Sequence, residues 1–382
     1  MKMIPFNRPT YLGGENKYIR EAINSGCYSG SGTFNKKCSD WFNKKIKCLD
    51  SFLLPSCTSA LEMALMLANI KPNDEVVLPS YTFSSCATAV LMHGGVPVFV
   101  DSSTNDFNLH ANDIEKSITR KTKVIMPMHY AGKGCEMNKI KKIAKKNNII
   151  VIEDSAQGID SYYREKPLGS FGDMSVFSFH ETKNITCGEG GMLCINNKEF
   201  LDRAYVVKDK GTNRRQFIRG EVDKYSWIDK GSSYLASEFQ AAFLFYQLKN
   251  IADIHNPRLR IWKLYHESMK DLEEMKFLKR PVINKNQKHN AHIYYIMLKN
   301  KAQRDNLKQY LNNKGVSTAT HYVPLHNSKA GKKFGKFYVK IENAHKISTC
   351  SLRLPIFHGM KISQVKYVVN NIKSFFNNDR KN

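Results

Sequence analysis

The first two hundred residues alternate short apolar runs with segments in which apolar positions recur at helical spacing. Apolar runs of strand length, bounded by turn residues, cover 74–80, 96–101, 123–132 and 148–158. Helix-length segments lie between them, at 59–69, 83–93 and 135–147. This alternation predicts an α/β protein with a mostly parallel central sheet flanked by helices. Because ligands of such sheets bind at the carboxyl ends of the strands, functional residues should follow the apolar runs.

The pattern changes beyond about residue 250. Helical patterns cover 256–275, 302–314 and 363–376, and a strand pattern covers 291–299. We therefore expect a large α/β domain over residues 1–250 and a smaller C-terminal α+β domain over residues 251–382.

The chain is strongly basic, with a formal net charge of +25. Such a balance suits nucleic acid, an anionic surface or an anionic small substrate. Lysine is spread over the whole chain, and the dense cluster 139–148 has the pattern of a helix with a charged outer face. We therefore expect no nucleic-acid partner. A basic nucleic-acid-binding protein is the alternative from a different class, and it predicts affinity that falls steeply with salt and no chromophore.

Cysteine usage and the chain start bear on the compartment. The nine cysteines are scattered singly, with no C-x-x-C pair, and residues 1–10 lack the apolar centre of a secretory signal. No run of 18 apolar residues occurs. These features predict a cytoplasmic protein without a membrane span or a disulfide framework.

The stretch 55–70, PSCTSALEMALMLANI, turns into a helix near Ser59. Ser59 and Glu62 have the spacing of a capping box, and the apolar positions form one stripe. A well-capped core helix is the ordinary interpretation. Since a helix N-terminus offers free N–H groups and a positive dipole end, an anion site is the functional one.

The stretch 151–158, VIEDSAQG, places Glu153 and Asp154 at the end of an apolar strand. A carboxylate there is costly unless a cation or hydrogen-bond donors meet it. It either caps a following helix or, in the case of Asp154, faces a ligand cation with Gln157 about one turn away.

The stretch 178–191, SFHETKNITCGEGG, brackets Lys183 between apolar residues and a glycine-rich turn. Desolvation lowers the pKa of a lysine and makes it a candidate Schiff-base nucleophile. The glycines would let the backbone pass close to a bound group, and Ser178 could offer its hydroxyl to a phosphate.

Two motif-like stretches are rejected. HETKN resembles a zinc motif but has Asn184 at the second histidine, so we expect no metal. GSGTFN (30–35) resembles a dinucleotide loop but has Asn35 at the third glycine and no preceding strand, which disfavours a dehydrogenase.

The three candidate features match the needs of pyridoxal phosphate. The capped helix suits its phosphate, the strand-end acid suits its pyridinium nitrogen, and Lys183 suits its aldehyde. Phe83, just beyond another strand end, offers an aromatic face for the ring.

Several motifs in a fixed order resemble one family. They are TS (58–59), YTF (81–83), EDSAQG (153–158), SFHETKN (178–184), GEGG (188–191) and HYVPLH (321–326). In these motifs, and nearly end to end from 4–9 to 351–357, the chain resembles the fold type I sugar-nucleotide aminotransferases of the DegT/DnrJ/EryC/StrS group. The resemblance implies pyridoxal 5'-phosphate, with pyridoxamine phosphate as its intermediate form, and a homodimer with active sites at the subunit interface.

Within that family, three stretches look closest to enzymes that aminate C4 of dTDP-4-keto-6-deoxyglucose. They are 178–184, 210–234 and 321–326. The resemblance implies a nucleotide-sugar substrate, glutamate as amino donor, and a dTDP-4-amino-4,6-dideoxyhexose for surface glycans of the O-antigen or lipopolysaccharide type. Amination at C3, or of a UDP- or GDP-linked keto sugar, is the alternative. A non-catalytic cofactor-binding protein would show the chromophore but no half-reaction with glutamate.

Site roles follow from the resemblance, position by position. Lys183 would be the Schiff-base lysine and proton carrier, Asp154 would pair with the pyridine nitrogen, and Gln157 would approach the ring hydroxyl. Phe83 would stack on the ring. The phosphate would be held by Thr58, Ser59 and Ser178.

The substrate side is carried over in the same way. His321, Tyr322 and His326 match a segment that approaches the substrate in relatives, and Arg214 could meet a diphosphate. Many relatives have GYNYR where this chain has GSSYL, so Ser233 stands where their Asn reaches the cofactor phosphate of the neighbouring subunit.

Overall fold

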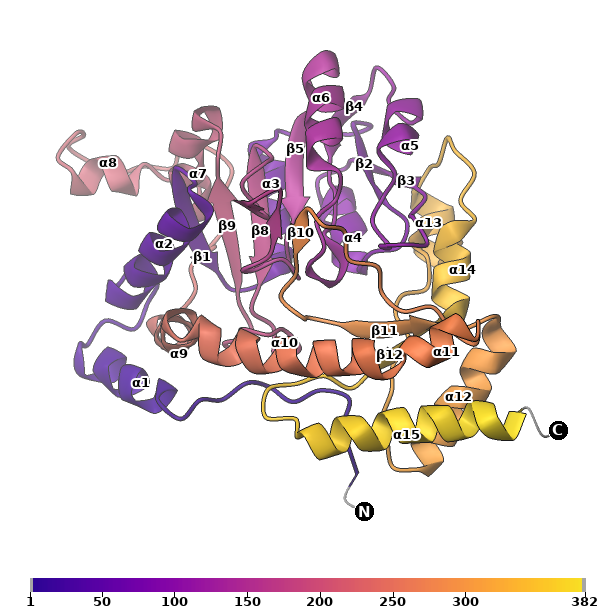
Figure 1. The fold of residues 1–382 in the computed structure, drawn as a ribbon. Coiled ribbons are helices and arrows are strands. Elements are labelled where there is room, and N and C mark those ends of the chain that lie inside the picture. The colour runs from indigo at the N-terminus through magenta and orange to yellow at the C-terminus, as the bar shows by residue number, and fades with distance from the viewer. Residues whose placement is uncertain (1–2, 380–382) are drawn as a thin grey trace.

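The protein is built around a seven-stranded sheet, seen in a computed structural model that describes residues 3–379 (Figure 1). The strand order is β1-β9-β8-β5-β4-β2-β3. Their bounds are β1 Asp50–Leu54, β2 Glu75–Pro79, β3 Val96–Val100, β4 Thr122–Ile125, β5 Ile150–Asp154, β8 Met174–Ser178 and β9 Gly191–Ile195. The five strands from β8 to β3 pair in parallel, and β9 is antiparallel to both its neighbours. The predicted mostly parallel sheet is confirmed.

Helices cover both faces of this sheet because its strands are apolar on both sides. Val76 packs into a core with α3 and α4, whereas its neighbour Val77 packs into a second core with α6. The lysine-rich helix α6 buries the apolar positions expected of it, Ile140 and Ile143. The helices of this part are α1 Glu15–Asn24, α2 Thr33–Ile46, α3 Cys57–Leu67, α4 Ser84–Met92, α5 Ala111–Lys116, α6 Met137–Asn147, α7 Leu201–Lys208, α8 Arg214–Ile218 and α9 Glu238–Lys249.

A separate apolar core lies in the C-terminal part, below the sheet in Figure 1. Its centre is an antiparallel pair of strands, β11 Tyr294–Met297 and β12 Ser351–Leu354. Around it lie α10 Ile251–Ser268, α11 Lys270–Glu274, α12 Lys301–Asn313 and α15 Ile362–Asp379. This part also contains α13 Lys329–Phe334 and α14 Asn343–Cys350. Helix α10 contributes to both parts, with Ile254 in a core of the large part and Ile261 in the C-terminal core. The division into two domains at residue 250 stays a prediction.

Smaller elements connect these parts. A three-stranded ribbon joins β6 Tyr162–Tyr163, β7 Lys166–Pro167 and β10 Gln287–Lys288. Short 3₁₀ turns lie at Tyr130–Gly132, Lys198–Phe200 and Leu325–Asn327. Helix α8 lies at the tip of an arm that extends from the body in Figure 1. Within residues 3–379, none of the helices has the length and apolar character needed to cross a membrane.

Parallel pairing brings the carboxyl ends of β2, β5 and β8 to one edge of the sheet. The strands β11 and β12 of the C-terminal part lie below that edge in Figure 1. The segments that follow the apolar runs therefore meet the C-terminal part, as expected for a ligand site in an α/β sheet.

Candidate active site

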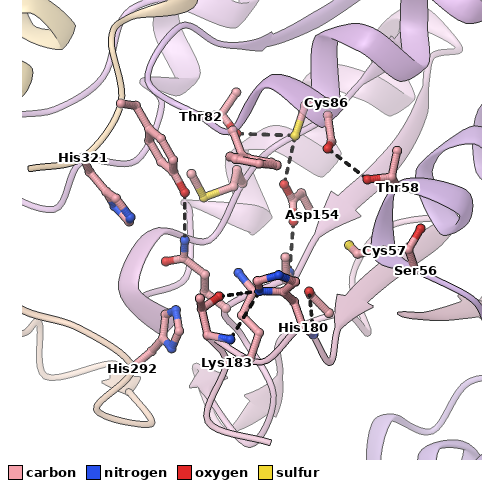
Figure 2. A pocket seen from close by; sticks show the side chains of 18 of the residues that line it. Ser56, Cys57, Thr58, Thr82, Cys86, Asp154, His180, Lys183, His292 and His321 are labelled. Carbon is pink, nitrogen blue, oxygen red and sulfur yellow. Dashed lines mark hydrogen bonds between the residues drawn. The ribbon is translucent and has the colours of Figure 1, made fainter. Parts of the chain in front are cut away.

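A cavity of about 420 Å³ lies at this edge of the sheet (Figure 2). Most of the residues that the sequence singled out line it: Thr58, Phe83, Asp154, Gln157, Ser178, Lys183, His321 and Tyr322. They come from the N-terminus of α3, from the ends of the strands and from a loop of the C-terminal part. Segments far apart in the chain thus form one site.

Lys183 lies in the connection between β8 and β9. Its backbone N–H donates to the carbonyl of His180 at 2.9 Å, which closes a turn, and its side chain lines the cavity. Burial lowers the pKa of Lys183, against the opposing effect of Cys57 and Asp154. A larger fraction of the amine is therefore uncharged and nucleophilic near neutral pH than for an exposed lysine.

Gly191 explains part of the glycine-rich turn. A Cβ at this position would lie 2.4 Å from the carbonyl carbon of Ser56, so only glycine lets β9 approach the start of α3 so closely. Gly188 has a φ of +83°, which closes the connection in the left-handed region. Gly191, the first residue of β9, thus supports the backbone at the N-terminus of α3. This role is separate from the one expected of the glycines, which was to let the backbone pass close to a bound group.

The two carboxylates that end β5 point to opposite faces of the sheet. Glu153 is fully buried and accepts hydrogen bonds from the backbone N–H groups of Gly169, Phe171 and Gly172 and lies 2.9 Å from His129 Nε2. Asp154 faces the cavity, where its Oδ2 accepts from the thiol of Cys86 at 3.0 Å and its Oδ1 accepts from the N–H of Ala156 at 2.9 Å. Glu153 is structural, and Asp154 is the carboxylate available to a ligand.

The N-terminus of α3 differs from the prediction in its cap. Ser56, rather than Ser59, caps the helix, and its Oγ accepts from the N–H of Ser59 at 3.0 Å. The capping box expected at Ser59 and Glu62 is wrong because the helix begins at Cys57, which puts Ser59 inside the first turn. Thr58 Oγ1 lies 2.9 Å from the hydroxyl of Ser85. The hydroxyls of Ser56, Thr58, Ser85 and Ser178 all line the cavity beside this helix end.

Gln157, His321 and Tyr322 line another part of the cavity wall, away from the N-terminus of α3. Gln157 is fixed at both ends, since its Oε1 accepts from the N–H of Ala131 at 2.7 Å and its Nε2 donates to Tyr322 Oη at 3.3 Å. The imidazole of His321 stacks on the ring of Tyr322 at 4.2 Å. Its Nδ1 lies 2.9 Å from Tyr130 Oη. Burial lowers the pKa of His321 well below its ordinary value, so this imidazole is neutral.

Some predicted site residues do not line this cavity. Ser59 lies behind Ser56, with 3.0 Å between their hydroxyls. His326 lies outside, 2.6 Å from Ser80 Oγ. Arg214, at the start of α8, pairs with Asp209 at 3.3 Å, and the exposed Ser233 forms a backbone bridge with the same residue. Arg214 and Ser233 therefore belong to the arm rather than to this cavity.

Other lining residues had been given no role. They are Ser56, Ser85, Cys86, His292 and Arg353, among others. Ser56, Ser85 and Cys86 stand beside motifs already singled out, so the helix starts were the signal that could have found them. Arg353 lies between two leucines of a strand, where alternation predicts a solvent-facing side chain.

The residues present fit pyridoxal phosphate. Asp154 offers a carboxylate to the pyridine nitrogen, the N-terminus of α3 with its hydroxyls suits a phosphate, and Lys183 offers an amine whose pKa burial lowers. Phe83 is 58% exposed, so its ring is available for stacking on the cofactor. The fold and this set of side chains define an α/β enzyme that uses pyridoxal phosphate.

Comparison with known proteins agrees with this class. The sequence profile of the DegT/DnrJ/EryC1/StrS aminotransferase family matches residues 12–373, and the chain belongs to this family. It is 34% identical over 351 residues to the uncharacterized protein MJ1066 of Methanocaldococcus jannaschii, covering 90% of each chain. It is 30% identical over 380 residues to GDP-perosamine synthase of Escherichia coli O157:H7, covering 98% of this chain and 99% of the relative.

A solved structure shows the same architecture. The aminotransferase TlmJ from Streptoalloteichus hindustanus superimposes with a TM-score of 0.88 at 25% identity, over 97% of this chain and 98% of that chain. The family and fold expected from the motifs are confirmed. The protein is a pyridoxal-phosphate-dependent sugar aminotransferase.

Proposed function

We propose that the protein transfers an amino group from L-glutamate to C4 of dTDP-4-keto-6-deoxyglucose. The product is a dTDP-4-amino-4,6-dideoxyhexose for surface glycans of the O-antigen or lipopolysaccharide type. The observation that carries the chemistry is the convergence of Lys183, Asp154 and the N-terminus of α3 on one cavity. The choice of sugar is supported by the resemblance in 178–184, 210–234 and 321–326.

The chain's own side chains divide the work in this proposal. Asp154 holds the ring nitrogen, and Phe83 and Gln157 contact the ring. Thr58 and Ser178, which line the cavity, serve the phosphate, and Ser59 supports them from behind Ser56 in the first turn of α3. When bound, the cofactor supplies an aldehyde that takes the amino group and a ring that delocalises the electrons of the broken C–H bond.

Lys183 moves the proton. Its uncharged Nζ takes the proton from the α-carbon of the amino acid, and in the second half-reaction it delivers a proton to C4 of the sugar. Burial lowers the pKa of Lys183, and this suits both directions, because it favours the free amine as a base and makes the ammonium a stronger acid. His321 and Tyr322 border the side from which the sugar enters in this proposal, with His326 behind them.

The proposed enzyme is a cytoplasmic homodimer. The arm formed by residues 209–234 supports the dimer, because it exposes large apolar side chains, including Trp227 at 78% and Ile218 at 69%. Arg214 and Ser233 lie on that arm, from which they would serve the partner subunit's site. Sedimentation of the wild type and of Trp227→Ser tests this; a wild-type monomer at micromolar concentration would contradict it.

A GDP-linked keto sugar is the second candidate. It is favoured by the 30% identity to GDP-perosamine synthase over nearly the whole length of both chains.

A competition experiment separates the two candidates. Enzyme loaded with the amino group from glutamate is mixed with equal amounts of dTDP-, GDP- and UDP-linked 4-keto-6-deoxy sugars, and the products are separated and assigned by NMR. We expect the dTDP sugar to be consumed first and to carry nitrogen at C4. Faster consumption of the GDP sugar, or nitrogen at C3, would replace the proposed substrate and leave the aminotransferase core intact.

A further inference from the structure

Arg353 is a cation of the cavity wall that no carboxylate within residues 3–379 neutralises. Its Nη1 contacts His321 Nε2, and its guanidinium lies over the ring of Phe6 at 4.7 Å. Burial lowers the pKa of Arg353. The neighbouring groups that act in the opposite direction and raise this pKa are the tyrosines Tyr130, Tyr322 and Tyr81. Its Nε is buried without a hydrogen-bond partner. A buried, unmatched donor costs stability, so this side chain has the features of one kept for a ligand.

The backbone presents Arg353 rigidly. Its strand, β12, pairs with Tyr295 of β11 on one side. On the other side its N–H donates to the carbonyl of Ala319 at 2.8 Å. The paired strand fixes the backbone of Arg353, and the contacts with Phe6 and His321 hold its guanidinium at the cavity, so less entropy is lost when it binds.

The neighbouring groups leave the positive charge uncompensated. Burial, with the charges of Lys183 and Arg353, lowers the pKa values of His292 and His321 well below the ordinary value, so both imidazoles are neutral. The nearby carboxylate, Asp154, already accepts from the thiol of Cys86 and from a backbone N–H. The wall opposite the sheet edge therefore attracts an anion.

We propose that Arg353 binds the α-carboxylate of the amino donor, which rests on the function proposed above. An amino acid must bring its nitrogen to the place of Lys183, and its carboxylate is attached to the same carbon. In the sugar substrate, the diphosphate at C1 lies across the ring from the keto carbon, so it is far from Lys183 when C4 reacts. The guanidinium fork also matches a planar carboxylate with two parallel hydrogen bonds.

The first test separates the two half-reactions in single turnovers of the loaded enzyme. Arg353→Gln should lower kcat/KM for glutamate about 100-fold, as expected for loss of a charge-assisted pair, and change that for the keto sugar by less than about threefold. Arg353→Lys keeps the charge but loses the guanidinium fork, so its kcat/KM for glutamate should lie between the values of the wild type and of Arg353→Gln. Arg280→Gln is the matched control, because Arg280 pairs with Glu273 at 2.7 Å outside the cavity.

The second test needs no turnover. Glutarate, which has carboxylates but no amino group, is titrated into the holoenzyme by calorimetry, and its Kd should rise at least about tenfold in Arg353→Gln. The Tm of the free variant should not fall, because the substitution removes an unpaired buried cation.

The outcomes are distinct. A glutamate kcat/KM unchanged in Arg353→Gln, or a loss confined to the keto sugar, overturns the proposal and assigns Arg353 to another role or to the diphosphate. A lower Tm with an unchanged glutarate Kd also overturns it, in favour of a structural role. If the wild type does not react with glutamate, the proposed donor is wrong, and the glutarate titration still decides whether Arg353 holds a carboxylate.

Discussion

Among the lysines whose pKa values burial lowers, two differ in their surroundings: one lies on the cavity wall and one lies in an aromatic core. Lys183 is half-buried and lines the cavity, with Asp154 among the charges that act on it. Lys133 is 1% exposed, donates to Tyr295 Oη at 2.8 Å and lies over the rings of Tyr295 and Phe107. Burial lowers the pKa of Lys133 to about 8.

The comparison shows that a lowered pKa alone does not mark a catalytic lysine. Both amines are desolvated, yet only the side chain of Lys183, of these two, lines a cavity that a ligand can enter. Lys133 is enclosed by aromatic side chains and does not line that cavity. Access to the cavity and a neighbouring helix N-terminus turn desolvation into chemistry at Lys183. At Lys133, which does not line the cavity, desolvation leaves a destabilising charge.

Removal of the cavity lysine should have the largest effect. Lys183→Ala should lower the rate of amino transfer by about 10⁵-fold or more, because the covalent attachment point and the proton carrier are both lost. Rapid mixing with glutamate measures this. A Lys183→Ala protein that keeps a tenth of the activity would contradict the assignment.

Removal of the neighbouring carboxylate should have the next largest effect. Asp154→Asn keeps the shape of the side chain but removes the charge offered to the ring nitrogen, and amino transfer should slow about 10²–10³-fold. Cofactor binding, followed by fluorescence, should weaken as well. Glu153→Gln is a useful contrast, since that carboxylate is buried on the other face and its loss should lower stability rather than specifically slow chemistry.

A methyl group at Gly191 tests the support under the helix end. Gly191→Ala should cost about 1–3 kcal/mol of folding free energy and weaken cofactor binding, because the Cβ would lie 2.4 Å from the backbone of Ser56. Thermal unfolding and cofactor titration measure the two effects. In the control Gly188→Ala, where no heavy atom lies within 4 Å of the new Cβ, strain from a positive φ is expected but cofactor affinity should hold. Equal affinities in both variants would refute this support role.

At the enclosed lysine no effect on cofactor binding is expected, and the change in stability has the opposite sign. The folded-state pKa of Lys133, about 8, lies below the ~10.4 of an unfolded chain, so protonation costs the folded protein most below pH 8 and nothing above about pH 10.4. Lys133→Met should therefore raise the free energy of unfolding by about 1–3 kcal/mol at pH 7, and the gain should shrink as pH rises through that window. Urea unfolding at several pH values measures it. A loss of stability, or a large loss of amino transfer, would erase the contrast with Lys183.

Much of the fold could be predicted because the buried strands are long apolar runs, and Lys183 and Asp154 each follow such a run. The start of α3 was misplaced because Ser56, Thr58 and Ser59 are all good caps, and only the observed hydrogen bond separates them. Arg353 was missed for a different reason.

The position of Arg353 depends on pairing between distant segments. Leu352 and Leu354 on either side of it suggest an ordinary strand with an outward charge. That outward face is covered by the sheet edge of the large part only in the folded chain, which puts the guanidinium into the cavity. The periodicity of a sequence indicates which side of a strand is apolar, but it does not indicate which other segment packs against either side in the folded protein.

The most direct test of the central claim is to locate the covalent attachment of the cofactor. Protein loaded with pyridoxal phosphate is reduced with borohydride, digested, and its peptides are sequenced by mass spectrometry. The account predicts the pyridoxyl mass on Lys183, with Lys133 unmodified. A pyridoxyl group on Lys133 or another lysine, or no modified lysine in protein that binds the cofactor, would contradict it.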